Sequence, residues 1–167
     1  FHCAGVLVAL LLFFAGKGIA VSYLGLSLVS CVYLFKIWQV QRRSPRPSAL
    51  KIGVRIVAAS IPVAFFMAWL QPALYISWFH VLFIGCFGLI TFSVATRVTL
   101  AHGAYSTDLE INSKTLWWLV SCLALGAVSR LLYGFSTGLW RTSYLHLAAT
   151  LWIMAVISWC LAFLPKI

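Results

Sequence analysis

Residues 79–96 read FHVLFIGCFGLITFSVAT, a stretch of the chain without Asp, Glu, Lys or Arg. A hydrocarbon core about 30 Å thick is crossed by about 20 mostly apolar residues in an α-helix. The stretch therefore predicts a membrane-spanning helix, which the next residues, RVTLAH at 97–102, end with a polar boundary. It decides the fold because a bilayer accepts only helices and closed β-barrels, and the alternating pattern of a barrel strand is missing.

The rest of the chain has the same character. Hydrophobic residues make up 63% of the 167 residues and charged residues only 8%, a balance outside that of soluble domains. We predict an all-α fold, a polytopic transmembrane bundle of about six helices embedded in the lipid bilayer, with residues 1–167 as a single domain. The apolar segments that define these helices are residues 1–16, 18–40, 52–70, 73–98, 115–135 and 142–164.

The formal charge of +10 comes from basic residues that bracket the apolar segments, which indicates membrane topology and argues against nucleic-acid binding. The loop between the second and third segments is strongly basic, whereas QPA at 71–73 carries no charge. By the positive-inside rule the basic loop is cytoplasmic. Alternation then places His102 and Lys166 on the cytoplasmic side, and the turns at Gln71 and Thr137 outside.

Ionisable side chains inside a membrane span are costly, so each of them indicates a site. His80 and His146 lie about seven and about five residues into their helices from the outer side, and thus at a similar depth at about 1.5 Å per residue. Two histidines from facing helices are what a b-type haem requires. We predict His80 and His146 as ligands of the iron of haem b, with Arg130 and Tyr133 binding the propionates, because guanidinium groups bind carboxylates in a bidentate fork.

His102 must belong to a different site, because it lies 22 positions beyond His80, about 33 Å along a continuous helix. At about 100° per residue, His80 and His102 share one face with Thr91 and Val98, which predicts a buried stripe. Asp108 and Glu110 follow His102 and are the only acidic residues in the chain. Two interpretations stay open for them: an ion pair or metal site with His102, or a solvated loop.

Simpler interpretations stand beside these predictions. Arg97 is explained as a positive charge that anchors the cytoplasmic end of its helix, and Arg130 as a side chain that extends outward to the interface. His146 fits an ordinary interfacial histidine, and Gly85 and Gly88 fit close helix packing. Motifs of soluble enzymes are absent from the sequence, so an enzymatic role would depend on a cofactor.

The run FHVLFIGCFGLITFSVATRVTLAHG at 79–103 resembles the most recognisable segment of the NnrS family, in which a helix with a histidine and a Gly-rich middle leads through an arginine to a GHTGR-like motif. His80, Gly85, Gly88, Arg97 and His102 occupy those positions. In place of the GHTGR motif the chain has AHGAY at 101–105, which lacks the threonine and the second arginine.

The resemblance implies a haem- and copper-containing, multi-pass protein of the bacterial inner (cytoplasmic) membrane, linked to denitrification and to tolerance of nitric oxide. It also implies that the chain corresponds to the C-terminal half of a longer protein, so that an N-terminal half or other membrane subunits are partners. Arg97 and His102 then form an inner-side site, with copper as the additional metal.

The leading hypothesis is a haem-binding protein of the NnrS type that acts in the nitric oxide response or in membrane electron transfer. An iron with an open position would bind nitric oxide or oxygen, whereas two histidine ligands would suit electron transfer. Two alternatives belong to other classes of protein: a cofactor-free structural subunit of a larger membrane complex, and one half of a dimeric small-molecule transporter.

Overall fold

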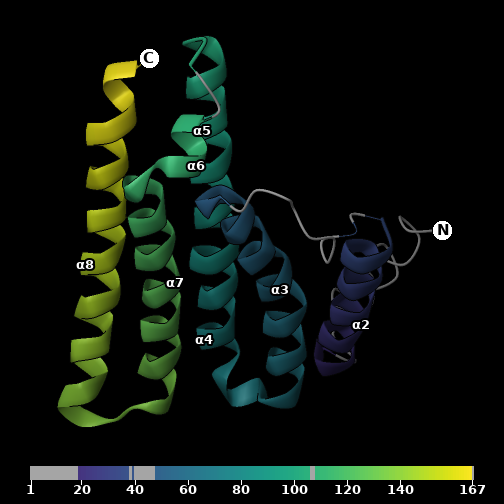
Figure 1. Ribbon diagram of the computed structural model, residues 1–167. Coiled ribbons are helices and arrows are strands. Elements are labelled where there is room, and N and C mark those ends of the chain that lie inside the picture. The colour runs from purple at the N-terminus through teal and green to yellow at the C-terminus, as the bar shows by residue number, and fades with distance from the viewer. Residues whose placement is uncertain (1–18, 38, 40–47, 106–107, 167) are drawn as a thin grey trace.

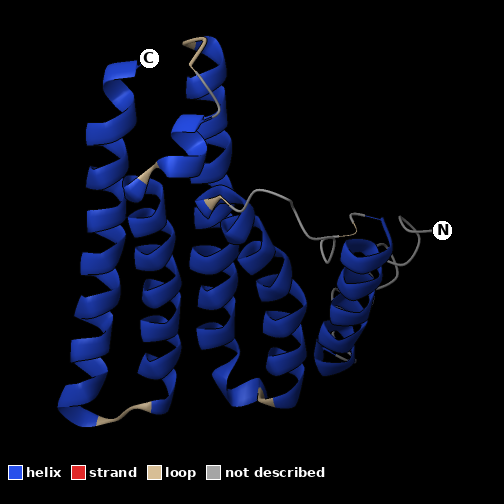
Figure 2. Cartoon of the chain, viewed as in Figure 1, coloured by secondary structure: helices blue, strands red, loops and turns tan. Residues whose placement is uncertain are grey.

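The computed structural model of the chain describes residues 19–37, 39, 48–105 and 108–166. Helices make up nearly all of these residues, and none of them forms a strand, which confirms the predicted all-α fold (Figure 2). The predicted segment 1–16 lies outside the described residues.

The second and third apolar segments form α2 and α3, which lie side by side in Figure 1. Helix α2 (Ile19–Val32) continues into a π-helical turn, η1 (Tyr33–Ile37). Helix α3 (Ala49–Leu70) begins at Ser48, whose side-chain oxygen accepts a hydrogen bond from the backbone N–H of Lys51 at 3.3 Å. Such an N-cap satisfies a backbone N–H group that has no partner within the helix.

The decisive stretch at 79–96 lies in a long helical rod made of four elements. A short 3₁₀ turn, η2 (Pro72–Leu74), leads into α4 (Tyr75–His80), and α5 (Leu89–His102) forms the far end. Between them lies a π-helix, η3 (Val81–Gly88). A π-helix is rare and often marks a functional position.

The π-helix changes the prediction of a buried stripe along this rod. Its wider turns rotate the chain by less than 100° per residue. Residues before and after it therefore do not share the faces that a continuous α-helix predicts. Thr91, Val98 and His102 are exposed, while His80 is half-buried. The prediction that these four residues share one buried face is therefore wrong.

The two glycines of the π-helix allow close packing of neighbouring helices. A Cβ at Gly85 would lie 3.2 Å from the hydroxyl of Ser60 on α3, and a Cβ at Gly88 would lie 2.8 Å from the indole of Trp152. The interpretation of Gly85 and Gly88 as helix-packing residues is confirmed.

The last part of the chain forms two long helices. A short helix, α6 (Asp108–Asn112), precedes α7 (Lys114–Phe135), which is N-capped by Ser113, and α8 (Gly138–Phe163) continues into a 3₁₀ turn, η4 (Leu164–Lys166). Two hydrogen bonds hold α8 in place. Ser129 on α7 donates to the backbone oxygen of Tyr144 at 2.8 Å, and the indole N–H of Trp159 donates to the hydroxyl of the buried Thr96 on α5 at 2.9 Å.

Among the described residues, four helices are long and apolar enough to cross a membrane: Ala49–Leu70, Pro72–His102, Lys114–Phe135 and Gly138–Lys166. A shorter apolar helix covers Val21–Lys36. In Figure 1 the helices stand roughly parallel, with α8 at one edge of the bundle and α2 at the other. Leucines fill the centre of the bundle, while large apolar side chains such as Leu139 and Leu161 are exposed on its outside. This pattern is that of a multi-pass membrane protein in contact with lipid.

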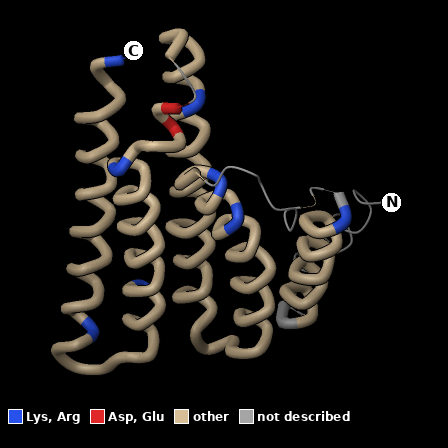
Figure 3. Tube along the Cα trace, in the orientation of Figure 1, with Lys and Arg blue, Asp and Glu red and all other residues tan. Residues whose placement is uncertain are grey.

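Charged residues lie mainly at one end of the bundle (Figure 3). The beginnings of α3 and α7 and the ends of α5 and α8 are at this end, while the turns at Gln71 and Thr137 are at the opposite end (Figure 1). The structure thus agrees with the predicted alternation of the loops. That the charged end faces the cytoplasm stays a prediction.

Candidate functional site

His80 and Arg130 form a polar pair between helices at the less charged end of the bundle. His80 is the last residue of α4, and its Nε2 lies 2.8 Å from a guanidinium nitrogen of Arg130 on α7. Its Nδ1 lies 2.7 Å from the backbone oxygen of Ile76. A carbonyl oxygen only accepts and a guanidinium only donates, so the proton is assigned to Nδ1 and the lone pair to Nε2. The ring is therefore oriented with Nε2 as its acceptor.

Tyr133 extends this cluster to a second arginine. The guanidinium carbons of Arg130 and Arg141 each lie 4.6 Å from the centroid of the Tyr133 ring, within the range of a cation–π interaction. The only acidic residues of the chain are Asp108 and Glu110, which lie at the opposite end of the bundle (Figure 3). No carboxylate of this chain neutralises these two guanidiniums, so the cluster attracts anions.

A shallow apolar cavity that opens to the outside of the bundle lies next to this cluster, between η3, α7 and α8. Its volume is about 440 Å³, and Arg130 supplies the only charged side chain among the residues that line it. Its remaining lining residues are Ile84, Leu145, Ala148, Ala149, Trp152 and Ile153. Ile84 follows His80 by four residues in the same rod, so the cavity begins about one turn from the histidine. The arrangement thus places the acceptor nitrogen of His80 and the guanidiniums of Arg130 and Arg141 near the apolar cavity.

The predicted partner of His80 lies elsewhere. His146 is exposed on α8, and α7 packs against α8 on one side and against α4 on the other. In the structure the side chain of His80 lies beside that of Arg130. Among the described residues, no hydrogen bond joins His80 to His146. Ligation by both histidines stays a prediction.

A second polar cluster occupies the charged end of the bundle. Glu110 accepts a hydrogen bond from the hydroxyl of Ser48 at 3.0 Å and forms an ion pair with Arg97 at 3.3 Å. The side chain of Glu110 is only 12% exposed, whereas that of Arg97 is 57% exposed. The interpretation of Glu110 as a solvated loop residue is therefore wrong, because its carboxylate joins the start of α3 to α5.

His102 lies at the end of α5 with an exposed side chain, and Glu110 pairs with Arg97 instead. Among the described residues, no group of three or more His, Cys, Asp or Glu side chains is close enough to hold a metal ion. Arg97 and His102 were predicted to form the inner-side site, and of these two Arg97 pairs with Glu110 in α6. Ser48, the third member of this cluster, could be recognised from the sequence only by its position just before an apolar segment.

The fold and the His80–Arg130 pair define a polytopic α-helical membrane protein with a polar site between its helices. A family model described as NnrS protein matches residues 2–167, and the chain belongs to the NnrS family. The resemblance seen in the sequence is thereby confirmed. No curated protein and no solved structure matches the chain.

Proposed function

We propose that this NnrS-family protein binds haem b through Nε2 of His80 and takes part in the nitric oxide response of the bacterial inner membrane. The observation that supports the proposal is the hydrogen bond from Nδ1 of His80 to the backbone oxygen of Ile76. A histidine that ligates a metal usually donates its other ring N–H to such a second partner, which fixes the ring and raises its basicity. His80 has this second partner, and iron at Nε2 would replace the hydrogen bond that Arg130 donates there, which would release the guanidinium for a propionate.

The residues around His80 fit haem in their chemistry. The cavity beside Arg130 is apolar, as the macrocycle requires, and the Arg130–Tyr133–Arg141 cluster suits the two carboxylates of the propionates. Haem, when bound, supplies either reversible binding of a diatomic gas or one-electron exchange. The protein would supply the iron ligand from His80, the counter-charges for the propionates from Arg130 and Arg141, and an apolar surface for the macrocycle.

The position of His146 favours gas binding over electron transfer. Because His146 is exposed on α8 and the Nε2 of His80 faces Arg130, the described residues offer one oriented histidine at this place. One histidine ligand leaves an iron position open for nitric oxide, whereas two would close it. Within the part of the chain that the structure describes, the copper that the family resemblance implies would find the exposed imidazole of His102 at the inner end.

A reduced-minus-oxidised absorption spectrum of the detergent-purified protein, repeated after addition of nitric oxide, tests the proposal. We expect a b-type spectrum that nitric oxide shifts. The His80→Ala variant should lose the spectrum, and the His102→Ala variant, which removes an exposed histidine, should keep it. A wild-type spectrum that nitric oxide leaves unchanged would contradict gas binding. Full haem content in His80→Ala would contradict the assignment of the ligand.

A cofactor-free structural subunit is the second candidate, and one observation favours it. At the start of α8, Leu139 is 86% and Trp140 is 71% exposed, next to the turn at Thr137. Aromatic and apolar side chains in such a position can contact another membrane subunit as well as lipid. Stoichiometric co-purification of a partner without haem, lost in Trp140→Ala, would favour this function.

A further inference from the structure

Helix α8 presents one face to the outside of the bundle. It packs on α7 and on α5, and in Figure 1 no other described helix lies on its far side. Residues two positions from a buried residue of a helix lie about 160° around its axis, at about 3.6 residues per turn. His146 and Thr150 each lie two positions from the buried Ala148. They therefore belong to the face opposite the core.

This outward face has the spacing of a coiled-coil seam. Its central residues recur at alternating intervals of four and three positions: Leu139, Ser143, His146, Thr150, Ile153 and Ile157. We call these residues the outer seam. All six are exposed, Leu139 to 86%, and none of them is charged. Alternation of three and four is the pattern with which two nearly parallel helices pack along each other, in membranes as in water.

Two polar residues of the outer seam lie at the depth of the hydrocarbon core. The middle of α8 (Gly138–Phe163) falls next to Thr150. Half of a core about 30 Å thick corresponds to about ten residues of helix, so the core begins near Arg141. His146 follows Arg141 by five positions and lies about 7 Å inside the core. Thr150 lies close to the midplane.

These two polar side chains have no partner within the described part of the chain. Among the described residues, no hydrogen bond or ion pair reaches the imidazole of His146 or the hydroxyl of Thr150. Lipid tails offer no hydrogen bond, so polar and ionisable side chains at this depth normally face protein or water. The outer seam is therefore poorly suited to lipid at its centre.

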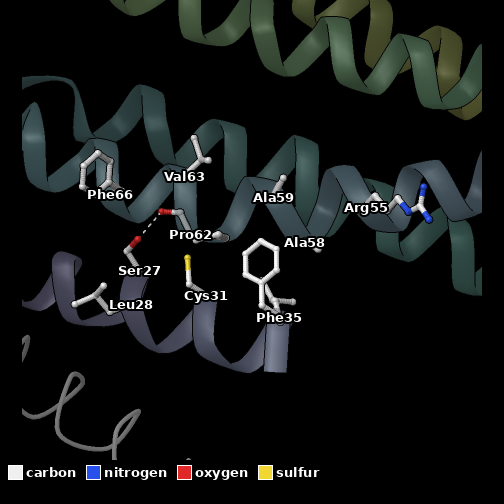
Figure 4. Close-up of a pocket in the computed structure, with 11 residues that line it drawn as sticks. Ser27, Leu28, Cys31, Phe35, Arg55, Ala58, Ala59, Pro62, Val63 and Phe66 are labelled. Carbon is white, nitrogen blue, oxygen red and sulfur yellow. Dashed lines mark hydrogen bonds between the residues drawn. The ribbon is translucent and has the colours of Figure 1, made fainter. Parts of the chain in front are cut away.

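Another exposed surface of the bundle lacks this feature. A groove of about 670 Å³ lies between α2 and α3, and its walls are mostly apolar (Figure 4). The hydroxyl of Ser27 in this groove donates to the backbone oxygen of Pro62 at 2.9 Å, and Arg55 also interacts with another residue. Because Ser27 and Arg55 have partners within the chain, lipid can cover this groove.

We propose that the outer seam is the interface of a homodimer, in which α8 packs in parallel against α8 of a second copy of this chain. Both copies have the same orientation in the membrane, so their two-fold axis runs along the membrane normal. Each level of the outer seam then meets the same level of the partner. Isoleucines meet isoleucines, and no charges repel each other across the interface.

The polar centre of the outer seam is complementary to itself. A neutral imidazole and a hydroxyl each carry a donor and an acceptor. In the dimer, His146 of one copy can therefore bond the imidazole or the Thr150 hydroxyl of the other, at a depth where lipid leaves both groups unpaired. Single polar positions in an apolar seam also fix the register and the number of helices. The proposal does not depend on haem, because the proposed iron ligand is His80.

Fluorescence energy transfer between copies labelled at the amino terminus, measured in phosphatidylcholine vesicles at several protein-to-lipid ratios, tests the dimer. We expect the wild type to dimerise. His146→Leu should weaken the dimer about five- to ten-fold, because each of two symmetric hydrogen bonds contributes about a factor of three. His146→Asn keeps a donor and an acceptor and should dimerise nearly as the wild type does. The control Leu125→Ala, at a position 57% exposed on α7, should have no effect.

Two results of this measurement would overturn the proposal. A monomeric wild type would mean that lipid or another polypeptide covers the outer seam. Equal dimerisation of His146→Leu and the wild type would mean that the polar centre does not hold the interface.

Photo-crosslinking in cell membranes leaves the polar centre unaltered and identifies the occupant. A photo-reactive amino acid in place of Ile157 should give a product of twice the mass of the chain, whereas the same group in place of Leu125 should not. A product with a different protein at Ile157, or equal products at both positions, would overturn the proposal.

Haem content separates this proposal from the proposed function. His146→Leu should keep the haem of the wild type, and its loss would overturn the interface, because it would assign the imidazole to iron. Absence of haem from a dimeric wild type would contradict the proposed function alone.

Discussion

Glu110 accepts from Ser48 and pairs with Arg97, so replacing it by alanine removes two interactions that join separate helices. Ser48 is fully buried, and a hydrogen bond to a charged acceptor contributes about 1.5–3 kcal/mol. The ion pair adds less than about 1 kcal/mol, because the side chain of Arg97 is 57% exposed and solvent screens it. We expect Glu110→Ala to lower the free energy of unfolding by about 2–3 kcal/mol.

The Glu110→Gln variant separates the two contributions. An amide oxygen still accepts from Ser48, but it is a neutral acceptor and forms no ion pair with Arg97, so this variant should lose about 1–2 kcal/mol and less than Glu110→Ala. Denaturant unfolding in detergent micelles, followed by tryptophan fluorescence, measures both values, and high salt should weaken only the Arg97 part. Asp108→Ala, which removes the exposed carboxylate two residues earlier, is the control and should cost less than Glu110→Ala.

Two results would refute this reasoning. Wild-type stability in Glu110→Ala would mean that the carboxylate does not join α3 to α5. Equal destabilisation by Glu110→Gln and Glu110→Ala would mean that the charge, and not the hydrogen bond from Ser48, carries the effect. A double-mutant cycle with Ser48→Ala measures the coupling, which we expect to exceed about 1 kcal/mol.

Three further variants test the helix contacts by the same unfolding assay. Trp159→Phe removes the bond to Thr96 and should cost about 0.6 kcal/mol, the average for such bonds in membranes, and a gain in stability would contradict the contact. Gly134→Ala places a Cβ against Ser77, so it should cost about 1–3 kcal/mol, and Ser77→Gly should restore part of the loss. Tyr133→Leu removes two cation–π contacts and should cost about 1–2 kcal/mol, whereas Tyr133→Phe keeps the ring and should cost clearly less.

The spans were predictable because lipid leaves so few solutions for the backbone. The predicted segments 52–70 and 115–135 agree closely with α3 (Ala49–Leu70) and α7 (Lys114–Phe135), since hydropathy and charged ends mark both boundaries. The π-helix η3 was not predictable from hydropathy, because the same apolar residues suit either helix type. Its presence is why Thr91 and Val98 lie on exposed faces.

The candidate site was predictable only in part. The cost of an ionisable group in the membrane singled out His80 and Arg130, and the structure brings them together at 2.8 Å. Depth along a helix placed His146 near the same level, but depth does not say which helices are neighbours. Because α7 packs between α4 and α8, Arg130 is the residue that meets His80. Glu110 was named in the sequence analysis, but its partners Ser48 and Arg97 were missed because they lie 62 and 13 positions away along the chain.

The stoichiometry of haem per protein, measured by the pyridine haemochrome assay on His80→Ala beside His102→Ala, tests the central proposal most directly. Nε2 of His80 is the ligand in this proposal, and His102 lies exposed at the far end of α5. We predict haem in the wild type and in His102→Ala, and its loss in His80→Ala. Equal haem in all three proteins, or none in a wild type purified with its natural partners, would contradict the proposal.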